Sequence, residues 1–185
     1  MSIRSIAVDS SSRTAVALLR ILCAQSFDLA PKFVTMHPDL PAMLKRCDAA
    51  LLIGDTALYT EHETRSLEKI DLGDEWEAMT GLPFVWSFWV GRSDSVQAEH
   101  IKALLAARDS GLQALDTIAE QYALEGADDD QVGIARAYLR ENVQHVLDAR
   151  GRAGLKKFFD VAADLGIVPS SGKLHFYLVD ETESA

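Results

Sequence analysis

The feature that most restricts the fold is an alternation of strand-like and helix-like segments in the first third of the chain. Apolar and β-branched runs predict strands at residues 3–8, 32–36 and 49–53. Helical apolar spacing predicts helices between them, at residues 14–26 and 38–46. Strands that alternate with helices form parallel sheets, because each helix returns the chain to the same edge. The sequence therefore predicts an α/β fold with a parallel sheet.

The rest of the chain is less regular at first and then helical. The predicted elements are a short helix at 76–79, an aromatic strand at 84–91, helices at 95–121 (with a break near Gly111), 128–141 and 151–165, and a small strand that could form at 174–178. We therefore expect an α/β first half and a helical second half.

Composition and charge narrow the functional classes. The chain has 185 residues and a formal net charge of -10. Nucleic acid and anionic membranes need a surplus of Lys and Arg, so neither is expected as a partner. The two cysteines lack metal-ligand and disulfide spacing, and there is no leader-like or membrane-length apolar run. These features predict a soluble protein in the cytoplasm.

The most informative local motif is D-S-S-S-R-T, residues 9–14, where the first strand passes into the first helix. Ser11, Ser12, Arg13 and Thr14 would bring hydroxyls, a guanidinium and unpaired backbone N–H groups to a helix N-terminus, where negative charge is favoured. The motif predicts a binding site for a carboxylate or phosphate. The alternative is that one serine merely caps the helix.

Two further segments supply candidate site residues. In L-L-I-G-D, Gly54 could let the backbone approach a ligand, and Asp55 could accept a hydrogen bond from a substrate hydroxyl or cap the following turn. In T-G-L-P-F-V-W-S-F-W, Trp86 and Ser87 are candidates for the wall of a ligand site. The other aromatic side chains of this segment are expected in the core.

Several common chemistries have no support in the sequence. The five histidines show no H-E-x-x-H spacing or zinc pattern, and the chain has no P-loop, G-x-G-x-x-G or G-x-S-x-G motif. Nucleotide binding, zinc binding and serine hydrolysis are therefore not predicted.

Taken in order, five segments resemble the chorismate dehydratases of the futalosine route to menaquinone. They are D-S-S-S-R-T-A-V-A-L-L, A-A-L-L-I-G-D-T-A-L, D-L-G-D-E-W-E-A-M-T-G-L-P-F-V-W-S-F-W, R-D-S-G-L and L-K-K-F-F-D-V-A-A-D-L-G-I-V. The resemblance spans residues 5–168, and it implies a periplasmic-binding-protein-like (type II) fold.

The resemblance also implies a reaction and a division of the chain. The family removes water from chorismate to give 3-[(1-carboxyvinyl)oxy]benzoate, with no metal or organic cofactor. Residues 1–92 would form an α/β lobe with the anion-binding loop and a crossing strand, and residues 93–185 a helical part of the other lobe. Ser11, Ser12, Arg13 and Thr14 would anchor carboxylates, and Asp55 would contact the hydroxyl or orient a donor. No catalytic base is identified.

The chain differs from the family at its start. Relatives carry a further α/β stretch, with a P-Y-L-N-type motif, ahead of the segment that matches residues 5–8. We expect a shortened dehydratase, a homologue that retains only carboxylate binding, or a chain that completes its site as a homo-oligomer. Two other interpretations are a related enzyme acting on dehypoxanthine futalosine, whose family usually has a T-T-A loop, and a structural interaction protein.

Overall fold

The computed structural model describes residues 3–9, 11–60, 67–92, 94–123 and 129–177. The chain forms two compact units. One, here called the sheet unit, comprises Met1–Trp86 and Asp148–Gly172, and the other, the helical unit, comprises Ser87–Leu147 and Lys173–Ala185.

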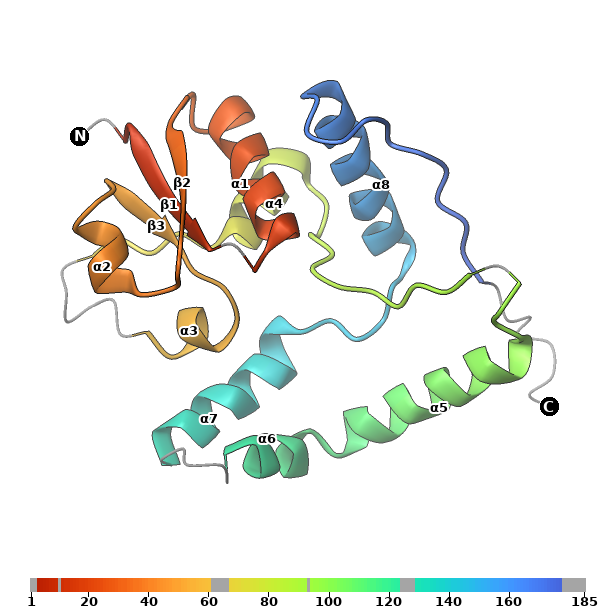
Figure 1. Ribbon diagram of the computed structural model, residues 1–185. Coiled ribbons are helices and arrows are strands. Elements are labelled where there is room, and N and C mark those ends of the chain that lie inside the picture. Colours follow the sequence, from red (N-terminus) through yellow and green to blue (C-terminus); the bar gives the residue numbers. More distant parts are fainter. Residues whose placement is uncertain (1–2, 10, 61–66, 93, 124–128, 178–185) are drawn as a thin grey trace. The chain divides into compact units, whose positions relative to one another are not determined.

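The sheet unit contains a three-stranded parallel sheet in the order β2-β1-β3 (Figure 1). Its strands are β1 (Ser5–Asp9), β2 (Lys32–Met36) and β3 (Ala49–Leu51). In the register, Val8 of β1 lies opposite Thr35 of β2 and Leu51 of β3. The predicted α/β alternation and parallel sheet are confirmed, and β1 is the central strand.

Helices cover both faces of this sheet. On one face, α1 (Arg13–Gln25) packs through Ala15, Leu19 and Cys23 against side chains of β1 and β3. On the opposite face, Ala7 of β1 packs with Met43 and Cys47, in and just after the short helix α2 (Leu40–Leu44). A strand covered on both faces is apolar along its whole length, which explains the I-A-V sequence of β1.

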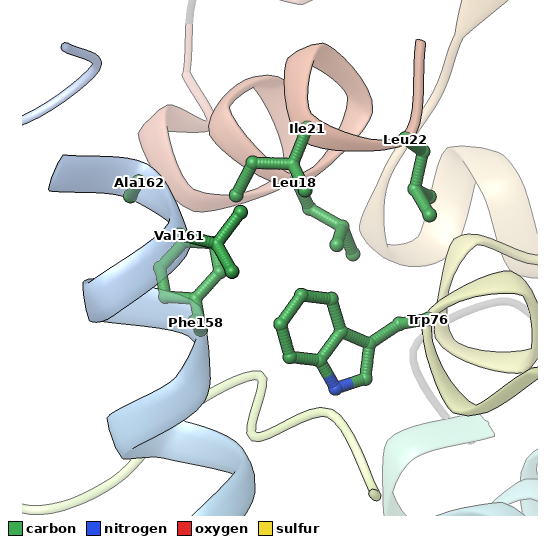
Figure 2. Close-up of a cluster of buried hydrophobic side chains, with 7 residues drawn as sticks. All are labelled: Leu18, Ile21, Leu22, Trp76, Phe158, Val161 and Ala162. Atoms are coloured by element: carbon green, nitrogen blue, oxygen red, sulfur yellow. The ribbon is translucent and has the colours of Figure 1, made fainter. Parts of the chain in front are cut away.

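A second apolar cluster joins α1 to two helices that are distant in sequence. The helices are α4 (Leu72–Thr80) and α8 (Ala149–Asp164). Figure 2 shows Trp76 of α4 between the side chains of α1 and α8. Trp76 is fully buried, with its ring edge-on to Phe84 and Phe158 at centroid distances of 5.7 and 6.1 Å. Among the described residues, its indole Nε1 has no hydrogen-bond partner.

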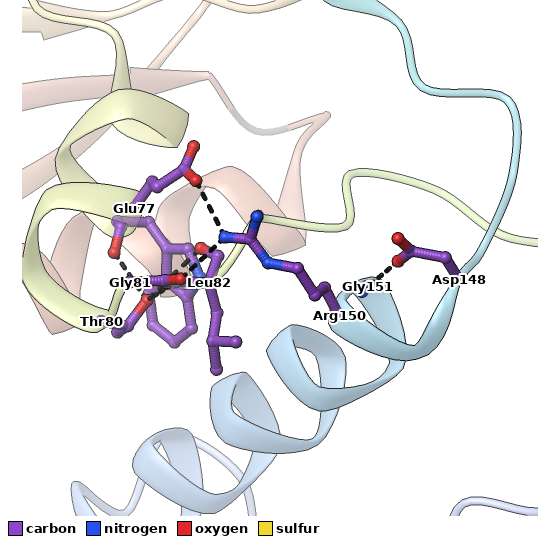
Figure 3. A network of polar contacts seen from close by, with 8 residues as sticks. Glu77, Thr80, Gly81, Leu82, Asp148, Arg150 and Gly151 are labelled. Atoms are coloured by element: carbon purple, nitrogen blue, oxygen red, sulfur yellow. Dashed lines mark hydrogen bonds and ion pairs between the residues drawn. The ribbon is translucent and has the colours of Figure 1, made fainter.

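Polar contacts fix the chain that leaves α4. The helix ends at Gly81, whose φ of 71° is a left-handed conformation that favours glycine. Arg150, near the start of α8, donates to the carbonyl of Gly81 at 3.0 Å and pairs with Glu77 at 3.4 Å (Figure 3). Thr80 Oγ1 accepts from the N–H of Leu82 at 3.2 Å. The start of α8 therefore holds the end of α4 in place.

The helical unit consists of α5, α6, α7 and a π-helical turn within the described residues. Their bounds are α5 Ala98–Gln113, α6 Leu115–Ala123, α7 Asp129–Ala137 and η2 Tyr138–Asn142. Asp116 of α6 pairs with Arg136 at 3.1 Å and with Arg140 at 2.5 Å, which ties α6 to α7 and η2. Within the described ranges, no helix combines the length and apolarity needed to cross a membrane.

Two predicted strands are wrong. Residues 84–91 are not paired with any strand, and Trp89 and Val90 are 83% and 85% exposed. Residues 174–177 are also not a strand, and residue 178 lies outside the described residues. The segment predicted as a helix at 95–121, with a possible break near Gly111, is two helices, α5 and α6, that meet at Ala114, close to that break. α8 packs with α1 and belongs to the sheet unit. The division into lobes at 92/93 stays a prediction.

Candidate functional site

The candidate site begins with the loop that joins the central strand to α1. Ser12 is the N-cap of α1, with an extended backbone, and its Oγ accepts from the N–H of Ala15 at 3.1 Å. The simpler interpretation of the motif, a capping serine, is therefore correct for Ser12. The N–H groups at the start of an α-helix have no acceptor within the helix, so those of Arg13 and Thr14 are suited to an anion.

The other residues of this loop are more exposed than Ser12. Ser11, Arg13 and Thr14 are exposed, and Ser12 is half-buried. α1 carries no acidic residue in its first turn, so its own sequence does not neutralise the partial positive charge there. This arrangement provides an exposed guanidinium and two exposed hydroxyl side chains, those of Ser11 and Thr14, beside a helix N-terminus.

Asp9 lies beneath the loop and is 5% exposed. Its Oδ1 accepts from the backbone N–H of Ser11 at 2.9 Å, and its Oδ2 accepts from Ser11 Oγ at 2.8 Å. Asp9 belongs to the motif but is not among the site residues predicted from sequence. Asp9 is buried because β1 is the central strand, and the sequence does not show the strand order. The position of Asp9 at the end of a predicted strand could nevertheless have identified it as a candidate site residue.

Gly54 and Asp55 follow β3 and lie at the same edge of the sheet as the loop. The parallel pairing of β1 with β3 brings the carboxyl ends of both strands to that edge. Gly54 has a φ of 59°, so this turn requires a residue that tolerates the left-handed region. Asp55 is exposed in the first turn of α3 (Gly54–Leu58), whose N-cap is Ile53. Asp55 is therefore not the capping residue of that helix.

Trp86 and Ser87 lie elsewhere. Trp86 is 51% exposed, and its ring packs edge-on against Phe84 at a centroid distance of 4.6 Å. A Cβ added at Gly73, near the start of α4, would lie 3.5 Å from the Trp86 indole. Ser87 is exposed and belongs to the helical unit. Ser11–Thr14 and Gly54–Asp55 follow strands that end at the same edge of the sheet. The roles of these residues, and those of Trp86 and Ser87, as ligand contacts stay predictions.

The opposite edge of the sheet is held by Asp48. Its Oδ2 accepts from the backbone N–H of Arg4, the backbone N–H of Ser5 and Ser5 Oγ, each at 2.9 Å. These hydrogen bonds, with that of the Arg4 backbone the largest contribution, lower the pKa of the Asp48 carboxyl. Asp48 comes directly before β3 and fastens it to the start of β1. This contact stabilises the pairing of β1 with β3, which brings Gly54 to the same edge of the sheet as the loop.

The sheet unit is thus an α/β structure with a small parallel sheet and a hydroxyl- and arginine-bearing loop at its carboxyl edge. Residues 1–164 match the model of the menaquinone biosynthesis family, and the chain belongs to that family. One curated relative is the chorismate dehydratase of Thermus thermophilus, which is 30% identical over 172 residues. The match covers 83% of this chain and 60% of that relative. The family predicted from the five segments is thus confirmed.

Proposed function

We propose that this chain acts on chorismate, as a lyase that removes water from it to give 3-[(1-carboxyvinyl)oxy]benzoate for menaquinone synthesis. The observation that carries the proposal is membership of the menaquinone biosynthesis family together with similarity to a protein named chorismate dehydratase. The chain spans about three fifths of that relative's length. In this proposal the fold is periplasmic-binding-protein-like and the protein works in the cytoplasm.

The loop has the chemistry that a dicarboxylate such as chorismate requires. A carboxylate placed at the start of α1 would accept from the Thr14 N–H and the Ser12 or Thr14 hydroxyl, and the exposed Arg13 guanidinium would balance its charge. Charge-assisted hydrogen bonds of this kind are roughly twice as strong as neutral ones. The loop would therefore supply binding and orientation of the substrate.

The reaction also requires removal of a ring proton and of the neighbouring hydroxyl. Together these leave as water, and the six-membered ring becomes aromatic, which supplies much of the driving force. Asp55 follows β3, whose carboxyl end lies at the same edge of the sheet as the loop. We assign Asp55 the role of orienting a donor to the departing hydroxyl.

A second candidate is a carboxylate-binding protein that performs no turnover. The arrangement of the acidic groups favours it, because both carboxylate oxygens of Asp9 are already engaged with Ser11. An engaged and buried carboxylate is suited to holding a loop, whereas a base must reach the ring proton. The two candidates share the binding loop and differ in whether product forms.

One experiment separates these candidates. The purified chain is incubated with chorismate, and the aromatic product is followed by absorbance and mass spectrometry, with the solution mass measured by light scattering. Formation of product supports the lyase, and a dimeric or larger mass would indicate that subunits share a site. Binding of chorismate without product supports the second candidate, and absence of both binding and product contradicts the proposed function.

A further inference from the structure

Asp9 is a buried carboxylate side chain that, within the described residues, is hydrogen-bonded to Ser11 through both of its oxygens. It is 5% exposed at the end of the central strand, and it holds the backbone N–H and the side chain of Ser11. A buried charge is costly unless it is hydrogen-bonded, and here both oxygens have a donor. Ser11 itself is exposed at the loop. Asp9 itself is buried, so any effect that it has on a ligand must pass through the exposed Ser11.

The hydrogen bonds fix the direction of the Ser11 hydroxyl. A serine hydroxyl has one hydrogen and two lone pairs, and a carboxylate can only accept. The hydrogen of Ser11 is therefore donated to Asp9 Oδ2, over a distance of 2.8 Å. What Ser11 Oγ can still offer to a ligand is a lone pair, so Ser11 is an acceptor position.

Ser12, the next residue, has the opposite hydrogen-bonding role. Its Oγ already accepts from the N–H of Ala15, at 3.1 Å. That bond uses a lone pair and leaves the hydroxyl hydrogen for another group. The loop therefore offers an acceptor at Ser11 next to a donor at Ser12.

We propose that Asp9 is a positioning residue that makes Ser11 the acceptor for the hydroxyl of the substrate, while the donors of Ser12 and Thr14 take its carboxylate. The inference rests on the proposed function above. Dehydration removes the hydroxyl, so chorismate can make the bond to Ser11 and the product cannot. Asp9 and Ser11 together thereby favour substrate over product and promote product release.

The substitution Asp9→Asn tests this directly because it preserves the size and reverses one hydrogen bond. The introduced amide can accept from the N–H of Ser11 through its oxygen, which places its NH₂ group against Ser11 Oγ. The Ser11 hydroxyl then accepts from the amide and turns its hydrogen outward. The substrate hydroxyl would now have to accept from Ser11, and its own hydrogen would lose the acceptor that Ser11 provides in the unmodified chain. Ser11→Ala removes the acceptor altogether at an exposed position.

The control is Asp39→Asn. Asp39 is an exposed N-cap of α2 in the same unit, where it accepts from the N–H of Ala42 at 2.9 Å. Asparagine caps helices about as well as aspartate, so this variant removes one negative charge and leaves the loop unchanged. It separates the effect of charge from that of hydrogen-bond direction.

The preference for chorismate is measured as the dissociation constant of the product divided by that of chorismate. KM and the product-inhibition constant are used for a chain that turns over, and dissociation constants otherwise. The preference for chorismate is expected to fall about threefold to tenfold in Asp9→Asn and Ser11→Ala, the range of one neutral hydrogen bond, with kcat changing less. The double variant should equal Ser11→Ala alone, and Asp39→Asn should match the unmodified chain.

The outcomes separate the role of Asp9 from the proposed function. An unchanged preference in an Asp9→Asn variant with unaltered circular dichroism overturns the role of Asp9, even if the chain converts chorismate. The same holds if Ser11→Ala leaves the preference unchanged, or if Asp39→Asn lowers it equally. If the unmodified chain neither binds nor converts chorismate, the proposed function fails and this inference fails with it.

Discussion

Gly154 lies where α8 contacts the chain that follows α4, and replacing it with alanine should destabilise the sheet unit. A Cβ added at Gly154 would lie 2.2 Å from the carbonyl oxygen of Pro83 and 3.7 Å from Leu82 Cβ. Ordinary contacts of a Cβ begin at 3.4 Å, so the added methyl group and Pro83 would have to separate by more than 1 Å. The contact is with backbone, which cannot rotate away as a side chain can.

The chain around Pro83 has little freedom to move. On one side, Arg150 holds the carbonyl of Gly81 at 3.0 Å, and Thr80 Oγ1 holds the N–H of Leu82 at 3.2 Å. On the other side, the ring of Phe84 packs edge-on against those of Trp76 and Phe158. A shift of Pro83 would therefore disturb both a polar network and the apolar cluster.

The magnitude follows from two opposing effects. Alanine is favoured over glycine within a helix by about 0.5–1 kcal/mol. Overpacking a well-filled contact costs about 1–3 kcal/mol, and a rigid backbone neighbour places this case in the upper half of that range. The free energy of unfolding of the sheet unit should therefore fall by about 1–2.5 kcal/mol.

Gly133→Ala in α7 is the matched control. The same methyl group added there meets nothing within 4 Å, so only the helix preference remains and local stability should rise by about 0.5–1 kcal/mol. Because the chain forms two compact units, amide hydrogen exchange should be read separately in α8 and α7. Exchange in α8 should accelerate in Gly154→Ala, and exchange in α7 should slow in Gly133→Ala. Unchanged or slower exchange in α8 of Gly154→Ala would refute the packing argument.

Three other perturbations have defined outcomes. Arg13→Ala should weaken chorismate binding by at least about 1.5 kcal/mol, the lower end for a charge-assisted hydrogen bond, and unchanged affinity in calorimetry would contradict the loop assignment. Trp76→Ala should destabilise the sheet unit by about 3–5 kcal/mol, measured by urea denaturation followed by circular dichroism, since the side chain is fully buried. Folding lowers the pKa of Asp48, so its ionised carboxyl stabilises the folded chain. This stabilisation is fully present above the unfolded pKa of about 3.9 and is lost as the pH falls through the folded pKa. The stability difference between the unmodified chain and Asp48→Ala should therefore shrink on acidification, and a difference that grows would be inconsistent with this.

The alternating strands and helices could be predicted from sequence because local signals and tertiary packing agree there. The strand at Lys32–Met36 has the predicted bounds, and α1 differs from its predicted range by one residue at each end. Apolar spacing determines these elements because each presents one or two faces to the core. The predicted helix at 128–141 corresponds to α7 followed by η2, a change of helix type that apolar spacing does not reveal.

The aromatic run could not be placed from its composition. Aromatic residues favour strands because they fit a pleated, half-buried surface, but a strand also needs a partner for its backbone. Phe84 joins the core, whereas Trp86 and Trp89 are exposed and their backbone is not in a sheet. The sequence shows how much aromatic surface is present and not whether a partner strand lies beside it.

The position of the candidate site could be predicted, but not how its hydrogen bonds run. Residues at the carboxyl ends of parallel strands share an edge, so the sequence correctly predicts that Ser11–Thr14 and Gly54–Asp55 lie at the same edge of the sheet. The contacts of Asp9 depend on the order of the strands and on the exact turn of the loop. These are tertiary features that residue types alone do not specify.

The most direct test of the binding loop is a titration of the isotopically labelled chain with chorismate, followed by the backbone amide signals in NMR spectra. If the loop holds a substrate carboxylate, the largest shifts should fall on Arg13, Thr14 and Ala15, with smaller shifts at Gly54 and Asp55. Saturable shifts confined to the helical unit, or no shifts at millimolar chorismate, would contradict the central claim that this loop is the binding site.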